Sequence, residues 1–145
     1  MSGLEQRVIR EALGWVGTPY RHQASCLGAG ADCLGLLRGV WRGLYGEEPE
    51  VVPAYTADWS EPQGDEVLMR AAERHLISKP VAEPAIADVV LFRMRQGGVA
   101  KHLGIQTRVG DAPEFVHAYS GYGVTVSPLS KPWARRIAAR FAFPG

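Results

Sequence analysis

A glycine-containing loop runs directly into an amphipathic helix at Asp32 and Cys33, and this junction constrains the fold more than any other stretch. The preceding residues, Leu27–Gly30, include two glycines and disfavour a helix. Beyond the junction, apolar residues recur at the spacing of one helix face, at Leu37, Val40, Trp41 and Leu44. Because Cys33 lies four residues before Leu37, its side chain is expected on the same buried face, in the first helical turn.

This position of Cys33 suits a nucleophile. Asp32 is well placed as the N-cap of the helix. A thiol at a helix N-terminus lies near the positive end of the helix dipole, which favours the thiolate. The alternative is a buried structural cysteine, because a free cysteine packs as a small apolar side chain. The position of Cys33 alone does not separate these two interpretations.

Length and composition indicate a single globular domain over residues 1–145. The net charge of +1 gives no general attraction to nucleic acid or to anionic membranes. No apolar run is long enough to span a bilayer, so we expect no membrane insertion. The first residues lack the pattern of a signal peptide, which predicts a protein made in the cytoplasm, or exported by another vehicle. The two cysteines do not form a disulfide framework.

Helical and strand patterns occupy different halves of the chain. A first helix is expected from a capping box at Ser2–Glu5 to a stop at Gly17, and the helix that follows the glycine loop should end near Gly46. A long connection, 47–63, precedes a helix over 65–76. Strands are expected over 88–93, 103–107, 114–119, 124–127 and 137–143. Helices followed by an antiparallel sheet predict an α+β fold.

Two histidines take matching positions in a predicted hairpin. Pairing His102 with His117 centres the turn between Val109 and Gly110, where glycine and polar residues lie. Residues opposite each other share a face of the sheet, so both imidazoles would meet. A catalytic cysteine needs a base, and the base needs an orienting group, so the pair indicates a site with Cys33. The alternative is two ordinary sheet histidines, and a register shift of one residue would separate them.

Further candidates border this predicted site. His22, in the loop before the cysteine helix, is a candidate for the edge of a substrate cleft. In the long connection, Tyr55 and Trp59 indicate packing or binding beside the same cleft rather than disorder. A weaker alternative is a zinc site built from His22, Cys26, Cys33 and His102. Since no closely spaced pair of ligands is present, we expect no metal.

Five short blocks follow one another along nearly the whole chain: Gly17–Tyr20, Asp32–Leu36, Ala87–Phe92, His102–Ile105 and Phe115–Ala118. In this order they resemble the signature of the NlpC family, which are papain-like cysteine peptidases of bacterial cell walls. The resemblance implies a papain-like fold in which N-terminal helices pack on an antiparallel sheet.

The resemblance also implies a role for individual residues. Cys33 resembles the nucleophile, His102 the general base and His117 the third residue, which orients the base. Tyr20 resembles the tyrosine whose hydroxyl lies near the nucleophile, and it is expected to bind the substrate or the oxyanion together with Asp32. No metal or cofactor is implied.

The chain departs from the family pattern at two positions. Leu34 stands where many relatives have serine, and it is expected to alter the cleft beside the thiol. Ala87 stands where many relatives have glycine. Family members commonly cleave the bond between D-glutamate and a diamino acid in peptidoglycan stem peptides. Some members are amidases or acyltransferases, and these activities remain alternatives.

A closer resemblance concerns Tyr20–Ser25 together with Asp32–Gly35, which look like the tail-associated members of phages and gene transfer agents. This implies a tail-tip or hub protein as partner and a particle that acts on the recipient cell wall. The alternative is a structural tail component that uses the fold for assembly. Retention of Cys33, His102 and His117 argues against that alternative, because assembly needs none of them.

Overall fold

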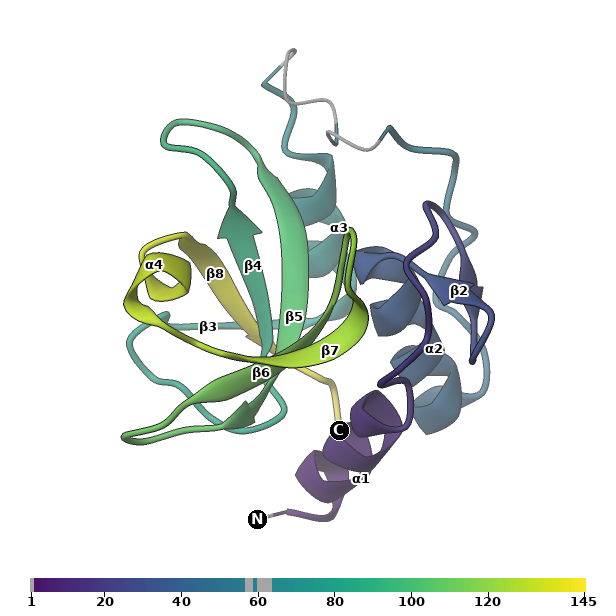
Figure 1. Ribbon diagram of the computed structural model, residues 1–145, viewed down its shortest axis with the longest axis horizontal. Helices are drawn as coiled ribbons and strands as arrows, with labels where there is room; N and C mark the ends of the chain where they lie inside the picture. Colours follow the sequence, from purple (N-terminus) through teal and green to yellow (C-terminus); the bar gives the residue numbers. More distant parts are fainter. Residues whose placement is uncertain (1, 57–58, 60–63) are drawn as a thin grey trace.

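The structure, a computed structural model, describes residues 2–56, 59 and 64–145. Its helices are α1 (Gly3–Leu13), α2 (Cys33–Tyr45), α3 (Val67–His75) and the short α4 (Lys131–Ala134). Its strands are β1 (Ser25–Cys26), β2 (Gly30–Ala31), β3 (Ile77–Lys79), β4 (Val89–Arg93), β5 (Ala100–Arg108), β6 (Glu114–Tyr119), β7 (Gly123–Pro128) and β8 (Ile137–Ala142). Helices come first and an antiparallel sheet follows (Figure 1), so the predicted α+β architecture is confirmed.

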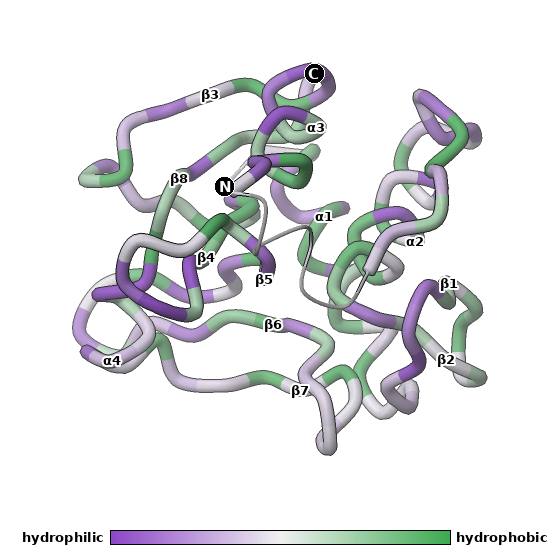
Figure 2. Tube along the Cα trace, turned by 90° about the horizontal axis from the view of Figure 1, so that it is seen from above, coloured by the Kyte–Doolittle hydropathy of each residue, from purple (hydrophilic) through white to green (hydrophobic). Residues whose placement is uncertain are grey.

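Six strands form one antiparallel sheet in the order β3-β8-β4-β5-β6-β7, and β1 pairs with β2 in a separate small hairpin. The central strands β4 and β5 pair with Phe92 opposite His102, while His117 on β6 pairs with Thr125 on β7. Seen from above, the strands lie between α2 on one side and α4 on the other (Figure 2). No helix within the described residues is long and apolar enough to cross a membrane.

The sheet has a separate apolar core on each face, because alternate residues of a strand point to opposite sides. The larger core joins the helices to one face and contains Val8, Leu36, Val40, Leu68, Leu91, Leu103, Ile105, Val116 and Phe141. The smaller core lies on the other face, where Val90, Phe92 and Phe115 are fully buried under Trp133 of α4. The two catalytic candidates on the sheet, His102 and His117, lie on the same face as this smaller core.

Several boundaries differ from those predicted. The first helix ends at Leu13 rather than near Gly17, since the chain turns at Gly14 and brings Trp15 back against α2. A Cβ at Gly39 would lie 2.0 Å from the Trp15 ring, which explains the glycine there. Strand β5 begins at Ala100, three residues before the predicted start of this strand. The elements that the sequence missed, β1, β2, β3 and α4, have two to four residues each, too few for a periodic pattern.

The predicted pairing of His102 directly opposite His117 is wrong by two residues. Ile105 pairs with Val116, which places Gly104 across from His117. A bulge between Gln106 and Arg108 shifts the register near the turn. Because the error is an even number of residues, both histidines still lie on the same face. A Cβ at Gly104 would lie 3.3 Å from the His117 Cβ, so this glycine leaves room for the two imidazoles to meet diagonally.

Candidate active site

The N-terminus of α2 is held by Asp32, which is almost completely buried. One carboxylate oxygen, Oδ1, accepts the backbone N–H of Gly35 at 2.7 Å, which confirms Asp32 as the N-cap. The other oxygen, Oδ2, accepts the backbone N–H of Gln23 at 2.7 Å. A Cβ at Gly35 would lie 1.8 Å from the Ala24 carbonyl oxygen. The loop backbone therefore packs directly on the first turn of α2 and fixes the position of Cys33.

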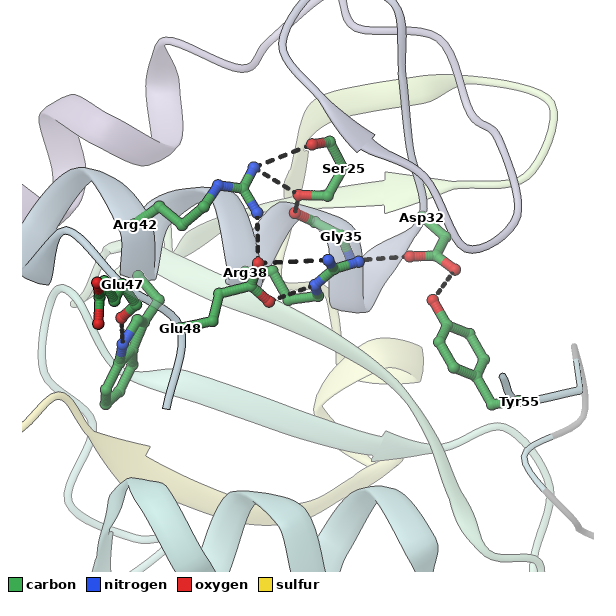
Figure 3. Close-up of polar contacts among 9 residues, drawn as sticks. Ser25, Asp32, Gly35, Arg38, Arg42, Glu47, Glu48 and Tyr55 are labelled. Atoms are coloured by element: carbon green, nitrogen blue, oxygen red, sulfur yellow. Dashed lines mark hydrogen bonds and ion pairs between the residues drawn. The ribbon is translucent and has the colours of Figure 1, made fainter. Parts of the chain in front are cut away.

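Charged side chains tie the long connection to the outer face of α2 (Figure 3). The Glu48 carboxylate accepts hydrogen bonds from Arg38 Nε at 2.6 Å and from Arg42 Nη1 at 3.0 Å. Arg42 Nη2 also donates to both oxygens of Ser25, each at 2.9 Å. The loop before α2, the helix and the connection after it are thus linked by one hydrogen-bonded network.

Tyr55 carries this connection into the site. Its hydroxyl donates to Asp32 Oδ2, and its carbonyl oxygen accepts Gln23 Nε2–H at 2.6 Å. The same carbonyl accepts His22 Nε2–H at 3.1 Å. The Tyr55 ring stacks on Trp59, with centroids 4.2 Å apart. Tyr55 therefore joins the long connection both to Asp32 and to Trp59.

A cavity of about 220 Å³ brings the predicted site residues together. It is lined by Tyr20, His22, Asp32, Cys33, Tyr55, Trp59, Met94, Lys101, His102, Ala118, Tyr119 and Ser120. The backbone N–H of Leu103, the residue after His102, lowers the pKa of the Cys33 thiol. Strand β5 packs against α2, and Cys33 and His102 both line this cavity.

His102 and His117 are in direct contact, although His117 lies behind the cavity wall. His102 Nε2 and His117 Nδ1 are hydrogen-bonded at 2.8 Å, and His117 Nε2 is hydrogen-bonded to Ser127 Oγ at 2.9 Å. The Trp133 ring packs against both imidazoles, with centroids 5.6 Å from His102 and 5.3 Å from His117. Since His102 Nε2 is occupied, only Nδ1 of His102 remains for another partner.

Sequence reasoning missed Ser127 and Trp133. Ser127 is two residues beyond Thr125, the partner of His117 on β7, and so lies on the same face. That alternation would have pointed to Ser127 once the β6–β7 pairing was known. Trp133 lies in a four-residue helix on the far side of the sheet, and no sequence pattern indicates its packing against histidines.

Burial holds the imidazoles in their neutral forms. Desolvation, with a smaller contribution from His117, lowers the pKa of His102 to about 3. Desolvation also lowers the pKa of His117 to about 4. A buried imidazolium would be poorly solvated, so both rings are neutral near pH 7.

The expectation that the helix N-terminus favours a Cys33 thiolate is wrong for the protein without substrate. Burial, and then the Asp32 carboxylate, raise the pKa of the Cys33 thiol to about 12. Backbone N–H groups of Leu103, Leu34 and Cys33 lower it, as the helix argument requires, but their contribution is smaller. The same surroundings, burial first and then Cys33 and Asp32, raise the pKa of Tyr20. The resting site therefore holds a neutral thiol and neutral imidazoles.

The structure shows where the two residues that depart from the family pattern, Leu34 and Ala87, lie. Leu34 lines a second, apolar cavity of about 160 Å³ between α2 and α3, which also contacts Tyr55 and Trp59. It is absent from the lining of the cavity that holds Cys33, so the expected change beside the thiol is not seen there. Ala87 has a φ of 73°, a left-handed conformation that glycine adopts more readily.

The set considered for zinc is not assembled. Cys26 is exposed on the small β1–β2 hairpin, whereas Cys33 is buried in the site. Within residues 2–56, 59 and 64–145, no group of three His, Cys, Asp or Glu side chains is arranged to hold a metal ion.

Comparison with known proteins shows which chains this one is similar to. No family model matches the chain. The chain is 27% identical over 146 residues to the murein DD-endopeptidase MepS/murein LD-carboxypeptidase of Escherichia coli K12, and equally to those of strains O6:H1 and O157:H7. The match covers 94% of this chain and 65% of each relative. The chain thus spans slightly less than two thirds of the length of the curated relatives it matches.

Solved structures give the same answer for the fold. A lipoprotein-like NLP/P60 family protein from Staphylococcus aureus Mu50 has a TM-score of 0.63 and 18% identity, with 98% of this chain and 42% of that chain covered. An NlpC/P60 family protein from Bacillus cereus ATCC 10987 has a TM-score of 0.64 and 19% identity, with 94% and 39% covered. The chain has the papain-like fold of NlpC/P60 proteins, and its resemblance to NlpC-type cell-wall peptidases is confirmed. The likeness to tail-associated members stays a prediction.

Proposed function

We propose that this protein is a cysteine peptidase that hydrolyses amide bonds in peptidoglycan stem peptides. One observation carries the proposal: Cys33 and His102 line the same cavity, and the far nitrogen of His102 is hydrogen-bonded to His117 at 2.8 Å. This arrangement supports Cys33 as nucleophile, His102 as base and His117 as orienting group of a thiol hydrolase. The curated relatives named above are murein peptidases, which supports the choice of substrate.

The proposed reaction begins with proton transfer from the Cys33 thiol to Nδ1 of His102. The sulfur attacks the amide carbonyl carbon, and a C–S bond forms as the carbonyl becomes an oxyanion. When the C–N bond breaks, His102 returns the proton to the leaving amine. Water then attacks the thioester carbon as His102 accepts its proton; the C–S bond breaks, the peptide leaves with a new carboxyl group, and His102 returns the proton to the Cys33 sulfur. His117 keeps the imidazole oriented throughout.

Two groups are proposed to stabilise the oxyanion. The backbone N–H of Cys33 belongs to the first turn of α2, where N–H groups have no partner within the helix. Tyr20 lines the same cavity, and burial, followed by the proximity of Cys33 and Asp32, raises the pKa of its hydroxyl, so that it stays a hydrogen-bond donor. Donors fixed in place before reaction are the most effective kind, because they need no reorganisation as charge develops.

The bond proposed for cleavage lies between D-glutamate and the diamino acid. The family resemblance supports this choice, and the amidase and acyltransferase activities of other members are the alternatives. The test is mass spectrometry of purified muropeptides after incubation with wild type, Cys33→Ala and Cys26→Ala. Cys26 is exposed outside the cavity and is therefore the matched control. We expect wild type and Cys26→Ala to release products with a free diamino-acid amine, and Cys33→Ala to release none.

Unchanged muropeptides in all three reactions would contradict the peptidase proposal. Products cut between N-acetylmuramate and L-alanine would indicate an amidase instead. Products of cleavage that persist with Cys33→Ala would exclude Cys33 as the nucleophile.

The peptidase is further proposed to open the recipient wall locally from a phage-like tail, bound to a tail-tip or hub protein. The resemblance of Tyr20–Ser25 and Asp32–Gly35 to tail-associated members supports this role. Tethering would raise the concentration of the peptidase at the wall. Particles assembled with Cys33→Ala should look intact but deliver DNA poorly to cells with whole walls. Delivery equal to wild type would favour the alternative, a structural role in assembly.

A further inference from the structure

The contact between the two histidines extends to a third side chain, Ser127, on the neighbouring strand β7. Ser127 pairs with Phe115 on β6 and lies on the same face as His117, two positions along the strand. Its Oγ is 2.9 Å from His117 Nε2. His117 is 1% exposed and Ser127 is half-buried, so Ser127 is the more exposed of the two partners.

His102, His117 and Ser127 form a row of hydrogen-bonded side chains. The positions of the hydrogen atoms along this row decide whether His102 can act as a base. A neutral imidazole carries one N–H, and the contact between His102 Nε2 and His117 Nδ1 holds one hydrogen. In one order, His102 Nε2–H donates to His117, and His117 Nε2–H donates to Ser127. In the reverse order, Ser127 donates to His117, His117 Nδ1–H donates to His102, and His102 Nδ1 carries a hydrogen.

Only the first order leaves a lone pair on His102 Nδ1, the nitrogen that remains for the Cys33 thiol. That order requires an acceptor for His117 Nε2–H, since a buried N–H without a partner is costly. Ser127 Oγ is the acceptor that the structure provides.

We propose that Ser127 is a positioning residue that accepts the His117 Nε2–H bond and thereby sets the tautomers of both histidines. The requirement for a free Nδ1 rests on the proposed peptidase function. The hydrogen order itself is a property of the protein without substrate. Because burial keeps both imidazoles neutral near pH 7, their tautomers can be measured there.

The test is nitrogen-15 NMR of the histidine side chains at pH 7 in wild type, Ser127→Ala and Ser127→Thr. In wild type, both imidazoles should carry hydrogen on Nε2 and none on Nδ1. Ser127→Ala should shift His117, and with it His102, toward the Nδ1–H form. Ser127→Thr keeps a hydroxyl and should give the wild-type tautomers.

On muropeptides, Ser127→Ala should lower kcat about tenfold with KM unchanged, and Ser127→Thr should restore it. A wild-type spectrum with His117 Nδ1–H, or unchanged tautomers in Ser127→Ala, would overturn the proposal. The NMR result needs no substrate, so failure of the peptidase function would be seen separately, as unchanged muropeptides with wild-type tautomers.

Discussion

Cys33 and the histidine pair, His102 and His117, are held by opposite kinds of surroundings. Around Cys33, backbone and side-chain hydrogen bonds converge on Asp32, while ion pairs link α2 to the connection after it and hydrogen bonds link it to the loop before it. Around His102 and His117, aromatic rings pack against the imidazoles, and hydrogen bonds join His102 to His117 and His117 to Ser127. The part of the site around Cys33 and Asp32, here the polar half, is fixed by polar geometry. The part around His102 and His117, here the histidine half, is fixed by apolar burial. Different perturbations should therefore disable each half.

The largest effect should come from acid acting on the histidine half. The pKa of each histidine is lower in the folded protein than the ordinary 6.5, so the unfolded chain binds more protons between pH 6.5 and about 4. Stability is complete above pH 6.5 and falls as the pH decreases, by about 1.4 kcal/mol per pH unit for each histidine. Urea unfolding at pH 7 and pH 4.5 should show a loss of several kcal/mol.

His117→Gln removes one of the two titrating groups and should reduce this loss by about half. Carboxylates such as Glu48 and Glu66, whose pKa is lowered from 4.5 in the folded protein, also contribute to the loss near pH 4.5, so the difference between wild type and His117→Gln gives the histidine part. Equal stability at pH 7 and pH 4.5 in wild type would show that burial does not hold the imidazoles neutral.

The next effect concerns the polar half. In Gly35→Ala, the added Cβ would meet the Ala24 carbonyl oxygen at 1.8 Å, and backbone cannot move aside easily. We expect a loss of about 3 kcal/mol in the free energy of unfolding, and loss of activity in any protein that folds. Gly43→Ala, on the same helix, meets only the flexible end of Glu11 and should be neutral or stabilising by up to about 1 kcal/mol. Similar unfolding curves for the two variants would contradict the close packing of loop and helix.

The smallest effect concerns the long connection. Tyr55→Phe removes the hydroxyl that donates to Asp32 but keeps the ring stacked on Trp59. Loss of one hydrogen bond to a carboxylate should destabilise the protein by about 1–2 kcal/mol, and KM should rise more than kcat falls. Tyr122→Phe, at a tyrosine that is 75% exposed, is the control and should change neither. An unchanged melting temperature and KM in Tyr55→Phe would make the connection a passive segment.

The sequence predicted the polar half well because its signals are local. Asp32, Cys33 and the apolar helix face lie within a few residues of one another, so capping and periodicity suffice. The contribution of Tyr55 was predicted only as packing near the cleft, since nothing in the sequence shows that its hydroxyl reaches Asp32.

The histidine half was predicted less completely because it depends on register across three strands. The sequence predicted correctly that His102 and His117 share a face, because the register error was an even number of residues. The bulge before Arg108 shifted the register, so the residue opposite each histidine was predicted wrongly. Ser127 and Trp133 approach from later parts of the chain, and only the folded sheet brings them to the imidazoles. The pKa of Cys33 was misjudged for a related reason: the helix terminus is visible in the sequence, whereas full burial of the thiol is not.

The central claim is that Cys33 and His102 act as one unit, and alkylation tests it without any substrate. Intact-protein and peptide mass spectrometry would follow the iodoacetamide reaction of both cysteines at pH 7 in wild type and His102→Gln. Glutamine fills much of the imidazole volume but is not a base. The account predicts that Cys33 reacts about a hundredfold more slowly in His102→Gln, while exposed Cys26 keeps its rate as an internal control. An equal Cys33 rate in the two proteins would contradict the assignment of His102 as the base.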